Sequence, residues 1–298
     1  MVPMRSRPGS LRLLVQMLAL AAVLSWAWPA SARAQDTPAV PRVSGPTTSP
    51  LDAARLAFFS ARYESAAQLS LDACATEADA LAGCELHTTA LLFQVRRLMG
   101  DDKDKKAALK RCATCPALVD TFAAALARGL TAGTARLRDV PTDDEARFLV
   151  GKLNLNFVWL HLGTLGRRTG WSEYWDARKS LDAVLSRNPM HIRARVARAW
   201  IDYIVDTQVR WGTRWLLGGG DKKRGLSVVR DAAAVGADFF TQAEARFALW
   251  DMQVREKNIA GAVASARALI RDFPENQELS RFLADAGAAP GTTPPSAD

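Results

Sequence analysis

The chain has 298 residues and a formal charge of +8, and 49% of its residues are hydrophobic and 23% are charged. This is an ordinary composition for a globular protein, and the length allows one sizeable core or an array of repeats. Residues 1–34 hold four arginines and no acids, so the remainder has 35 basic and 31 acidic residues, a net charge of +4. That small excess does not indicate a nucleic-acid partner.

The N-terminus has the three parts of a secretory signal peptide. Three arginines precede residue 13, residues 13–28 form an apolar run, and Pro29 follows. Ala32-Arg33-Ala34 then gives a small-x-small cleavage site before Gln35. We expect residues 1–34 to be removed, with a retained membrane anchor as the alternative. No cysteine precedes Cys74, so the sequence predicts a soluble periplasmic protein that is not a lipoprotein and has no stable membrane insertion after cleavage.

Composition divides the rest of the chain into three parts. Residues 35–50 are rich in proline without a hydrophobic period, which predicts an extended linker. Residues 287–298, GAAPGTTPPSAD, predict a disordered tail. The ordered domain is expected over 51–286.

Apolar residues recur with the helical period through this domain, and no strand-like alternation is present. The sequence therefore predicts an all-α protein of about 12 helices. They are expected near 51–61, 64–75, 84–99, 104–112, 116–129, 143–167, 172–187, 191–207, 221–235, 241–256, 259–271 and 275–285.

Three helix starts carry capping signals. Thr142 and Glu145 have the spacing of a capping box, in which each side chain bonds the backbone N–H of the other residue, and Thr241 and Glu244 repeat it. Asp221 is the expected cap of the helix after the glycines.

A repeated pattern of small residues and prolines identifies the arrangement of the helices. Ala177 and Ala262 each follow a larger side chain by three residues and precede a proline, Pro189 or Pro274, by twelve. Residues 63–73 match the start of the same pattern. This resembles the second helix of a tetratricopeptide repeat, a helix–turn–helix unit of about 34 residues. The two prolines are 85 residues apart, so an insertion is needed, and 207–224 is its expected place.

The resemblance implies a right-handed solenoid of antiparallel helical hairpins, whose first helices line a concave groove. All seven tryptophans beyond residue 34 lie between 159 and 250, and tryptophan is enriched at binding sites. Alignment by the two prolines places ten residues in the groove: Trp159, Leu162, Arg193, Val196, Trp200, Tyr203, Glu244, Phe247, Asp251 and Arg255. The expected partner is another envelope protein or an extended peptide.

The stretch RWGTRWLLGGGDKKRG, residues 210–225, is expected to be a sharp joint between helices. Gly218–Gly220 would supply positive φ angles and let Trp211 and Trp215 tuck under the next hairpin. The alternative is an anion site at the helix N-terminus, formed by Gly219, Gly220, Lys222 and Lys223.

The same joint is similar to that of the periplasmic T-component of tripartite ATP-independent transporters, which has a tetratricopeptide fold. That resemblance implies a second function, a small-molecule-binding accessory of a transport system. It predicts a closed pocket among Trp159, Trp200 and the joint 210–224.

The four cysteines are Cys74, Cys84, Cys112 and Cys115, an even number in an oxidising compartment, so disulfides are expected. Three connectivities are possible, and bonds 74–84 and 112–115 suit the predicted helix ends. A four-thiolate zinc site is an alternative.

The chain lacks a recognisable catalytic motif. The three histidines are dispersed, and neither HExxH nor GxSxG occurs. We therefore expect a non-enzymatic scaffold without a cofactor or metal. An enzyme would instead bring titratable groups with shifted pKa values into one tight cluster.

Overall fold

The chain divides into two units, Met1–Val40 and Pro41–Asp298. A computed structural model describes residues 49–288 apart from 101 and 210, all within the second unit. The expected signal peptide 1–34, the linker up to residue 48 and the tail from residue 289 lie outside the described residues.

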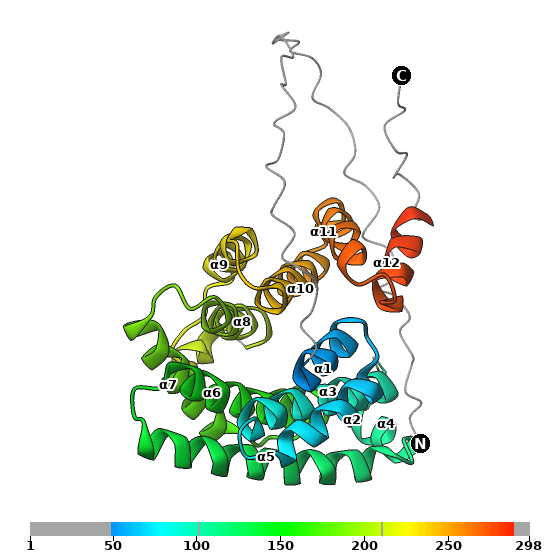
Figure 1. The fold of residues 1–298 in the computed structure, drawn as a ribbon. Coiled ribbons are helices and arrows are strands. Elements are labelled where there is room, and N and C mark those ends of the chain that lie inside the picture. Colours follow the sequence, from blue (N-terminus) through cyan, green and yellow to red (C-terminus); the bar gives the residue numbers. More distant parts are fainter. Residues whose placement is uncertain (1–48, 101, 210, 289–298) are drawn as a thin grey trace, which may run out of the picture. The chain divides into compact units, whose positions relative to one another are not determined.

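The described residues form twelve α-helices, as the periodicity predicts, and contain no strand (Figure 1). A π-helical turn, η1, follows α6, and a 3-10 helix, η2, follows α8. The elements are α1 (Pro50–Phe59), α2 (Tyr63–Ala75), α3 (Ala80–Met99), α4 (Lys105–Arg111), α5 (Cys115–Asp139), α6 (Asp144–Val158), η1 (Trp159–Thr164), α7 (Trp171–Arg187), α8 (Ile192–Gln208), η2 (Trp211–Leu217), α9 (Lys222–Ala234), α10 (Phe239–Arg255), α11 (Ile259–Asp272) and α12 (Gln277–Ala288).

Apart from α4 and α5, helices that follow one another in the chain pack together, and α3 also contacts α5 and α6. The largest core includes Phe122 from α5, Phe148 and Leu153 from α6, and Leu181 from α7, none of which is exposed to solvent. None of the helices in the described part of the chain combines the length and apolarity needed to cross a bilayer.

Aspartates, and not the expected threonines, cap α6 and α10. Asp143 accepts a hydrogen bond from the Ala146 N–H at 2.8 Å, and Asp238 accepts one from the Thr241 N–H at 3.0 Å. Both predicted capping boxes are therefore wrong, because a carboxylate close by in the sequence fills each cap. The expected cap of α9 is correct, since Asp221 accepts from the Arg224 N–H at 2.9 Å.

Helix α5 continues ten residues past its expected end at residue 129. Gly129 and Gly133 are buried, and a Cβ on Gly133 would lie 2.4 Å from Cγ2 of Val150. These glycines bring α5 close to α6 and do not end the helix, which is why a boundary placed by composition was too early.

The expected helix 143–167 consists of α6 followed by the π-helical turn η1. The π-turn carries Trp159, and Gly166 ends the segment with a φ of +65°. A π-turn shifts the register of the side chains that follow it, and such turns are frequent at functional sites.

The four cysteines pair at disulfide distance. Cys74 and Cys84 join the end of α2 to α3 with a Cα–Cα distance of 4.5 Å. Cys112 and Cys115 pair across the turn between α4 and α5 with a Cα–Cα distance of 5.4 Å.

Helices α1 and α2 meet α10, α12 and the segment between α11 and α12 across what we call the seam. Asn276 donates a hydrogen bond to the carbonyl of Phe59 at 2.7 Å, and the Tyr63 hydroxyl donates to Glu278 at 2.9 Å. The Phe59 ring lies 5.4 Å from Phe247 and 5.5 Å from Phe273. Residues more than 200 positions apart in the sequence are therefore in direct contact.

Candidate functional site

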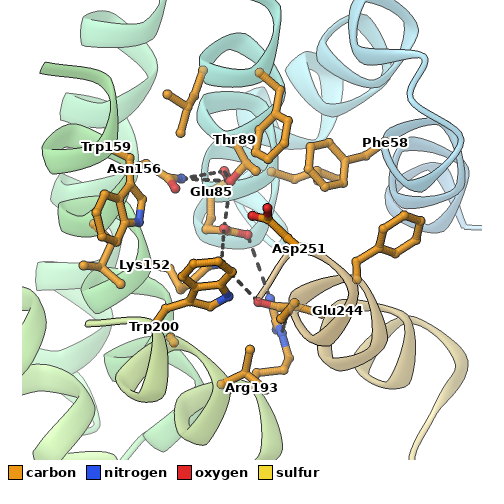
Figure 2. Close-up of a pocket in the computed structure, with 18 of the residues that line it drawn as sticks. Phe58, Glu85, Thr89, Lys152, Asn156, Trp159, Arg193, Trp200, Glu244 and Asp251 are labelled. Carbon is orange, nitrogen blue, oxygen red and sulfur yellow. Dashed lines mark hydrogen bonds and ion pairs between the residues drawn. The ribbon is translucent and has the colours of Figure 1, made fainter. Parts of the chain in front are cut away.

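A cavity of about 2010 Å³ is bounded by α1, α3, α6, α8 and α10 (Figure 2). Each helix supplies a distinct part of the wall: Phe58 comes from α1, Glu85 and Thr89 from α3, Lys152 and Asn156 from α6, Trp200 and Arg193 from α8, and Glu244 and Asp251 from α10.

The structure brings together nine of the ten groove residues expected from the sequence. Trp159, Leu162, Arg193, Val196, Trp200, Glu244, Phe247, Asp251 and Arg255 all line the cavity. Tyr203 does not line it. Its side chain is buried on α8, where it packs with α9 and α10 and its hydroxyl donates to Glu256 at 2.8 Å.

Aromatic side chains are spread over the whole wall. Six helices and η1 supply Phe58, Phe59, Tyr63, Phe93, Trp159, Trp171, Trp200, Phe240, Phe247 and Trp250. The aromatics of α1, α2 and α3 had no counterpart in the sequence-based groove, because the repeat pattern is weak before residue 172. The pair Phe58-Phe59 at the end of an amphipathic helix was the available signal.

Five charged side chains form an ion cluster on one part of the wall: Glu85, Glu145, Lys152, Arg193 and Glu244. The Lys152 ammonium lies 3.0 Å from Glu244, and the Arg193 guanidinium lies 2.8 Å from the other oxygen of the same carboxylate. Both cations also lie 3.9 Å from Glu85, and Arg193 contacts Glu145 at 3.0 Å. In Figure 2, dashed lines join the Glu85 carboxylate to both cations, and the Glu244 carboxylate lies beside Arg193.

Mutual charge keeps the cluster ionised although it is largely buried. Burial alone would raise the pKa of Glu244, but Lys152 and Arg193 lower it to about 2. Burial would lower the pKa of Lys152, whereas Glu244 and Glu85 raise it above its usual value. The pKa of Arg193 is raised in the same way. Glu244, Lys152 and Arg193 thus carry fixed charges at neutral pH.

Asn156 and Thr89 hold the cluster against α3. The Asn156 amide donates to the Thr88 and Thr89 hydroxyls at 3.0 and 2.9 Å, and the Thr89 hydroxyl also contacts a Glu85 oxygen at 3.0 Å. Sequence reasoning missed Glu85, Thr89 and Lys152. The signal was present, since Glu85 and Lys152 are lone charges within apolar stretches, and buried charges are rare unless they are paired.

A second charged group lies beside the tryptophan of α8. Arg255 bonds Asp251 at 3.0 Å on the same helix, and its guanidinium lies 5.5 Å from the Trp200 ring. This gives one part of the wall an indole face with both signs of charge next to it.

The joint after α8 follows the sequence prediction in part. Gly218 and Gly219 both have a φ of +75°, while Gly220 allows close approach, because a Cβ there would lie 2.6 Å from the Asp206 backbone nitrogen. The expectation that Trp215 tucks under the next hairpin is wrong, since 73% of its surface is exposed. The Trp211 side chain lies outside the described residues.

The residues of the alternative anion site already have protein partners. The Lys222 N–H donates to Asp206 at 2.8 Å, and the Lys222 ammonium pairs with Glu256 at 2.8 Å. Carboxylates therefore occupy the N-terminus of α9, where an anion would have to bind. The Gly219 N–H donates to the Arg214 carbonyl at 3.0 Å, and Lys223 forms no ion pair within the described part of the chain.

The described residues contain no group of three or more His, Cys, Asp or Glu side chains arranged to hold a metal ion. Comparisons with protein-family models, with curated proteins and with solved structures found no match to this chain.

Proposed function

We propose that this protein is a non-enzymatic binding protein of the periplasm, and that its cavity holds an extended segment of another envelope protein. The proposal includes export by residues 1–34 and a tetratricopeptide-like solenoid whose inner face forms the cavity wall. The observation that carries it is the wall itself, which combines ten aromatic side chains with charges of both signs.

The size of the cavity favours a polypeptide segment over a small molecule. Pockets for small ligands measure roughly 300–1,000 Å³, and this cavity measures about 2010 Å³. The expected small-molecule pocket would also include the joint, but none of the joint's residues 214–224, whose side chains the structure describes, lines the cavity. A transport accessory that binds a small molecule is therefore the second hypothesis, and the experiment below distinguishes it from polypeptide binding.

The electrostatics of the wall support binding over catalysis. A general base at neutral pH needs a pKa near 7, and Glu244, the central carboxylate, has a pKa of about 2. The raised pKa of Lys152 likewise keeps its amine protonated and without a nucleophilic lone pair. These charges can orient a polar backbone or a charged side chain of a partner.

The test is photo-crosslinking in the native envelope. A benzophenone amino acid would replace Trp200 on the wall and, as a matched control, Leu98, which is 51% exposed and does not line the cavity. We expect a discrete polypeptide adduct at position 200 but not at position 98. Adducts of equal intensity at both positions would contradict the proposal, and a bound small mass in native mass spectrometry would favour the transport accessory.

Affinity measurements with the captured partner would use Trp200→Ala. This change removes an aromatic wall residue and leaves the ion cluster intact. Arg193→Glu is less informative, because it would place a fourth carboxylate in the cluster and unsettle the fold. N-terminal sequencing of this protein, purified from the cell envelope, checks the export part of the proposal. Gln35 is the expected first residue.

A further inference from the structure

A group of exposed aromatic and aliphatic side chains lies at the start of α7 and in η2. Of the eleven exposed large apolar side chains in the described residues, four belong to this group, which we call the tryptophan patch: Trp171, Trp175, Trp215 and Leu216. Their exposed fractions range from 44% to 73%. Trp171, Trp175 and Leu216 line one shallow hollow together with Val209 and Leu217.

Hydrogen bonds fix the two segments of the patch to each other. Arg178 donates to the carbonyls of Leu217 and Gly218 at 2.6 and 3.1 Å, and the Tyr174 hydroxyl donates to Leu217 at 2.9 Å. The Arg178 guanidinium also lies 5.7 Å from the Trp175 ring. The patch is therefore held in place by α7, and its exposure is a feature of the folded chain.

Cations without carboxylate partners border the patch. Arg167, Arg168 and Lys179 are exposed and form no ion pair within the described residues. Lys105 also forms no ion pair there. Lys105 lies next to the loop between η1 and α7, since a Cβ on Gly166 in that loop would be 3.5 Å from the Lys105 side chain. The acidic side chains nearest in sequence are Glu173, which accepts a bond from Ser172, Asp176, and Asp182, which pairs with Arg198 at 2.7 Å and with Arg178 at 3.8 Å.

Indole rings and unpaired basic side chains have a common preferred environment. Tryptophan concentrates at the boundary between lipid headgroups and acyl chains, and nearby lysine and arginine are attracted to anionic headgroups. A protein partner would bury these cations and would have to supply carboxylates for them, whereas an anionic membrane leaves them in the wet headgroup layer.

From this combination we propose that the tryptophan patch docks the protein onto an anionic phospholipid surface. Trp171 and Arg168 also line the cavity, so docking would place the cavity next to the membrane. The interaction is peripheral and does not depend on the function proposed for the cavity.

Vesicle co-sedimentation tests this inference with a chain that lacks residues 1–34. This chain keeps every described residue, and it removes the apolar leader, which could bind lipid by itself. The probes are extruded vesicles of phosphatidylethanolamine with phosphatidylglycerol, and vesicles of pure phosphatidylcholine. We expect binding to the first that is at least ten-fold stronger than to the second and weakens in high salt.

Two pairs of variants make the test specific to the patch. Trp171→Ser with Trp215→Ser, and separately Arg167→Glu with Arg168→Glu, should each reduce the partition coefficient at least ten-fold. Met190→Ser, at a residue with 63% exposure outside the patch, and Arg267→Glu should leave it unchanged. Circular dichroism of each variant checks that the helices are retained.

Failure of this proposal is distinguishable from failure of the proposed function. Equal binding to both lipid compositions, or equal loss in the patch and control variants, would overturn membrane docking. So would capture of a soluble protein through the patch with no vesicle binding. Trp200→Ala should bind vesicles like the wild type, because Trp200 lies on the cavity wall and not in the patch.

Discussion

Glu244 is the residue on which the ion cluster depends, because it contacts both cations at hydrogen-bond distance. Its side chain is only 20% exposed, and those of Lys152 and Arg193 are 19% and 17% exposed. Removing one partner from a largely buried set of charges leaves the others without compensation, which costs more than the loss of an exposed pair.

Glu244→Gln should therefore lower the free energy of unfolding by about 3 kcal/mol. The matched control is Glu275→Gln, since Glu275 pairs with Arg62 at 3.2 Å but is 64% exposed. That change should cost less than about 0.5 kcal/mol. Urea unfolding followed by circular dichroism measures both. Equal midpoints for the two variants would show that the ion cluster contributes no more than a surface pair.

The low pKa of Glu244 predicts a loss of stability in acid. Its pKa is about 2 in the folded chain and 4.5, the ordinary value of a glutamate, in the unfolded chain, so the unfolded state binds the proton more readily. The stabilisation is complete above pH 4.5 and is lost progressively as pH falls towards 2. Urea midpoints across this range should fall steeply for the wild type and less steeply for Glu244→Gln. Parallel curves would contradict the assignment.

At the residue scale, the sequence predicted positions better than contacts. Of the ten residues named by the alignment, nine line the cavity, because the helical period determines which side chains of α8 and α10 share a face. Tyr203 does not line the cavity, because it is buried where α8 packs with α9 and α10. The partners of Glu244 could not be predicted, because Lys152 is 92 residues away and on a helix without a clear repeat.

At the element scale, α2 and α3 form the tightest helix pair. Gly83 lies on α3 against the end of α2, and a Cβ there would be 2.4 Å from the Cys74 nitrogen and 2.5 Å from the Ala73 carbonyl carbon. These are backbone atoms, so a flexible side chain cannot move aside to make room. The Cys74–Cys84 pair lies at the same crossing.

Gly83→Ala should consequently destabilise the protein by about 1–3 kcal/mol, as overpacking does. Gly236→Ala is the control, because a Cβ added to Gly236 would have no neighbour within 4 Å and Gly236 does not have a positive φ. It should be neutral or should raise the free energy of unfolding by up to about 1 kcal/mol. Thermal unfolding compares the two, and a neutral Gly83→Ala would show that α2 and α3 separate more easily than this packing implies.

Helix existence was predictable throughout the described residues, whereas helix ends were less so. The apolar period is a property of many residues and survives local exceptions. The end of α5 and the π-turn after α6 depend on which helix packs against Gly133 and Trp159. These contacts belong to the tertiary structure and cannot be read from the local sequence. The same limit explains the wrong caps, where Thr142 and Asp143 both have side chains able to cap.

At the scale of the whole molecule, the seam joins the two ends of the described chain. Asn276 has a double role there. Its amide donates to the Phe59 carbonyl, and its oxygen accepts from the Leu279 N–H at 3.0 Å. Arg62 and Glu275 add an exposed ion pair nearby. The repeat resemblance alone predicts an open array, and it carried no signal for this contact.

Asn276→Ala should loosen α1 as well as α12. Asn258→Ala is the matched control, because Asn258 also caps a helix, α11, but does not contact α1. Hydrogen–deuterium exchange should show at least ten-fold faster exchange of the α1 amides in Asn276→Ala, since a hydrogen bond to a largely buried carbonyl is worth about 1 kcal/mol or more. Unchanged α1 exchange would show that the aromatic contacts of Phe59 hold the seam without Asn276.

The length of chain between the two sides of the seam also sets an order of events during synthesis. Phe59 and Asn276 are separated by 217 residues. At a translation rate of roughly 5–20 residues per second, Asn276 is synthesised about 10–40 s after Phe59. For that time the aromatic rings around Phe59 lack their C-terminal neighbours and are exposed to other chains. The last step in completing the cavity is thus also the step during which aggregation with other chains is easiest. A chaperone that shields α1 should therefore raise the yield of folded protein more than one that shields α6.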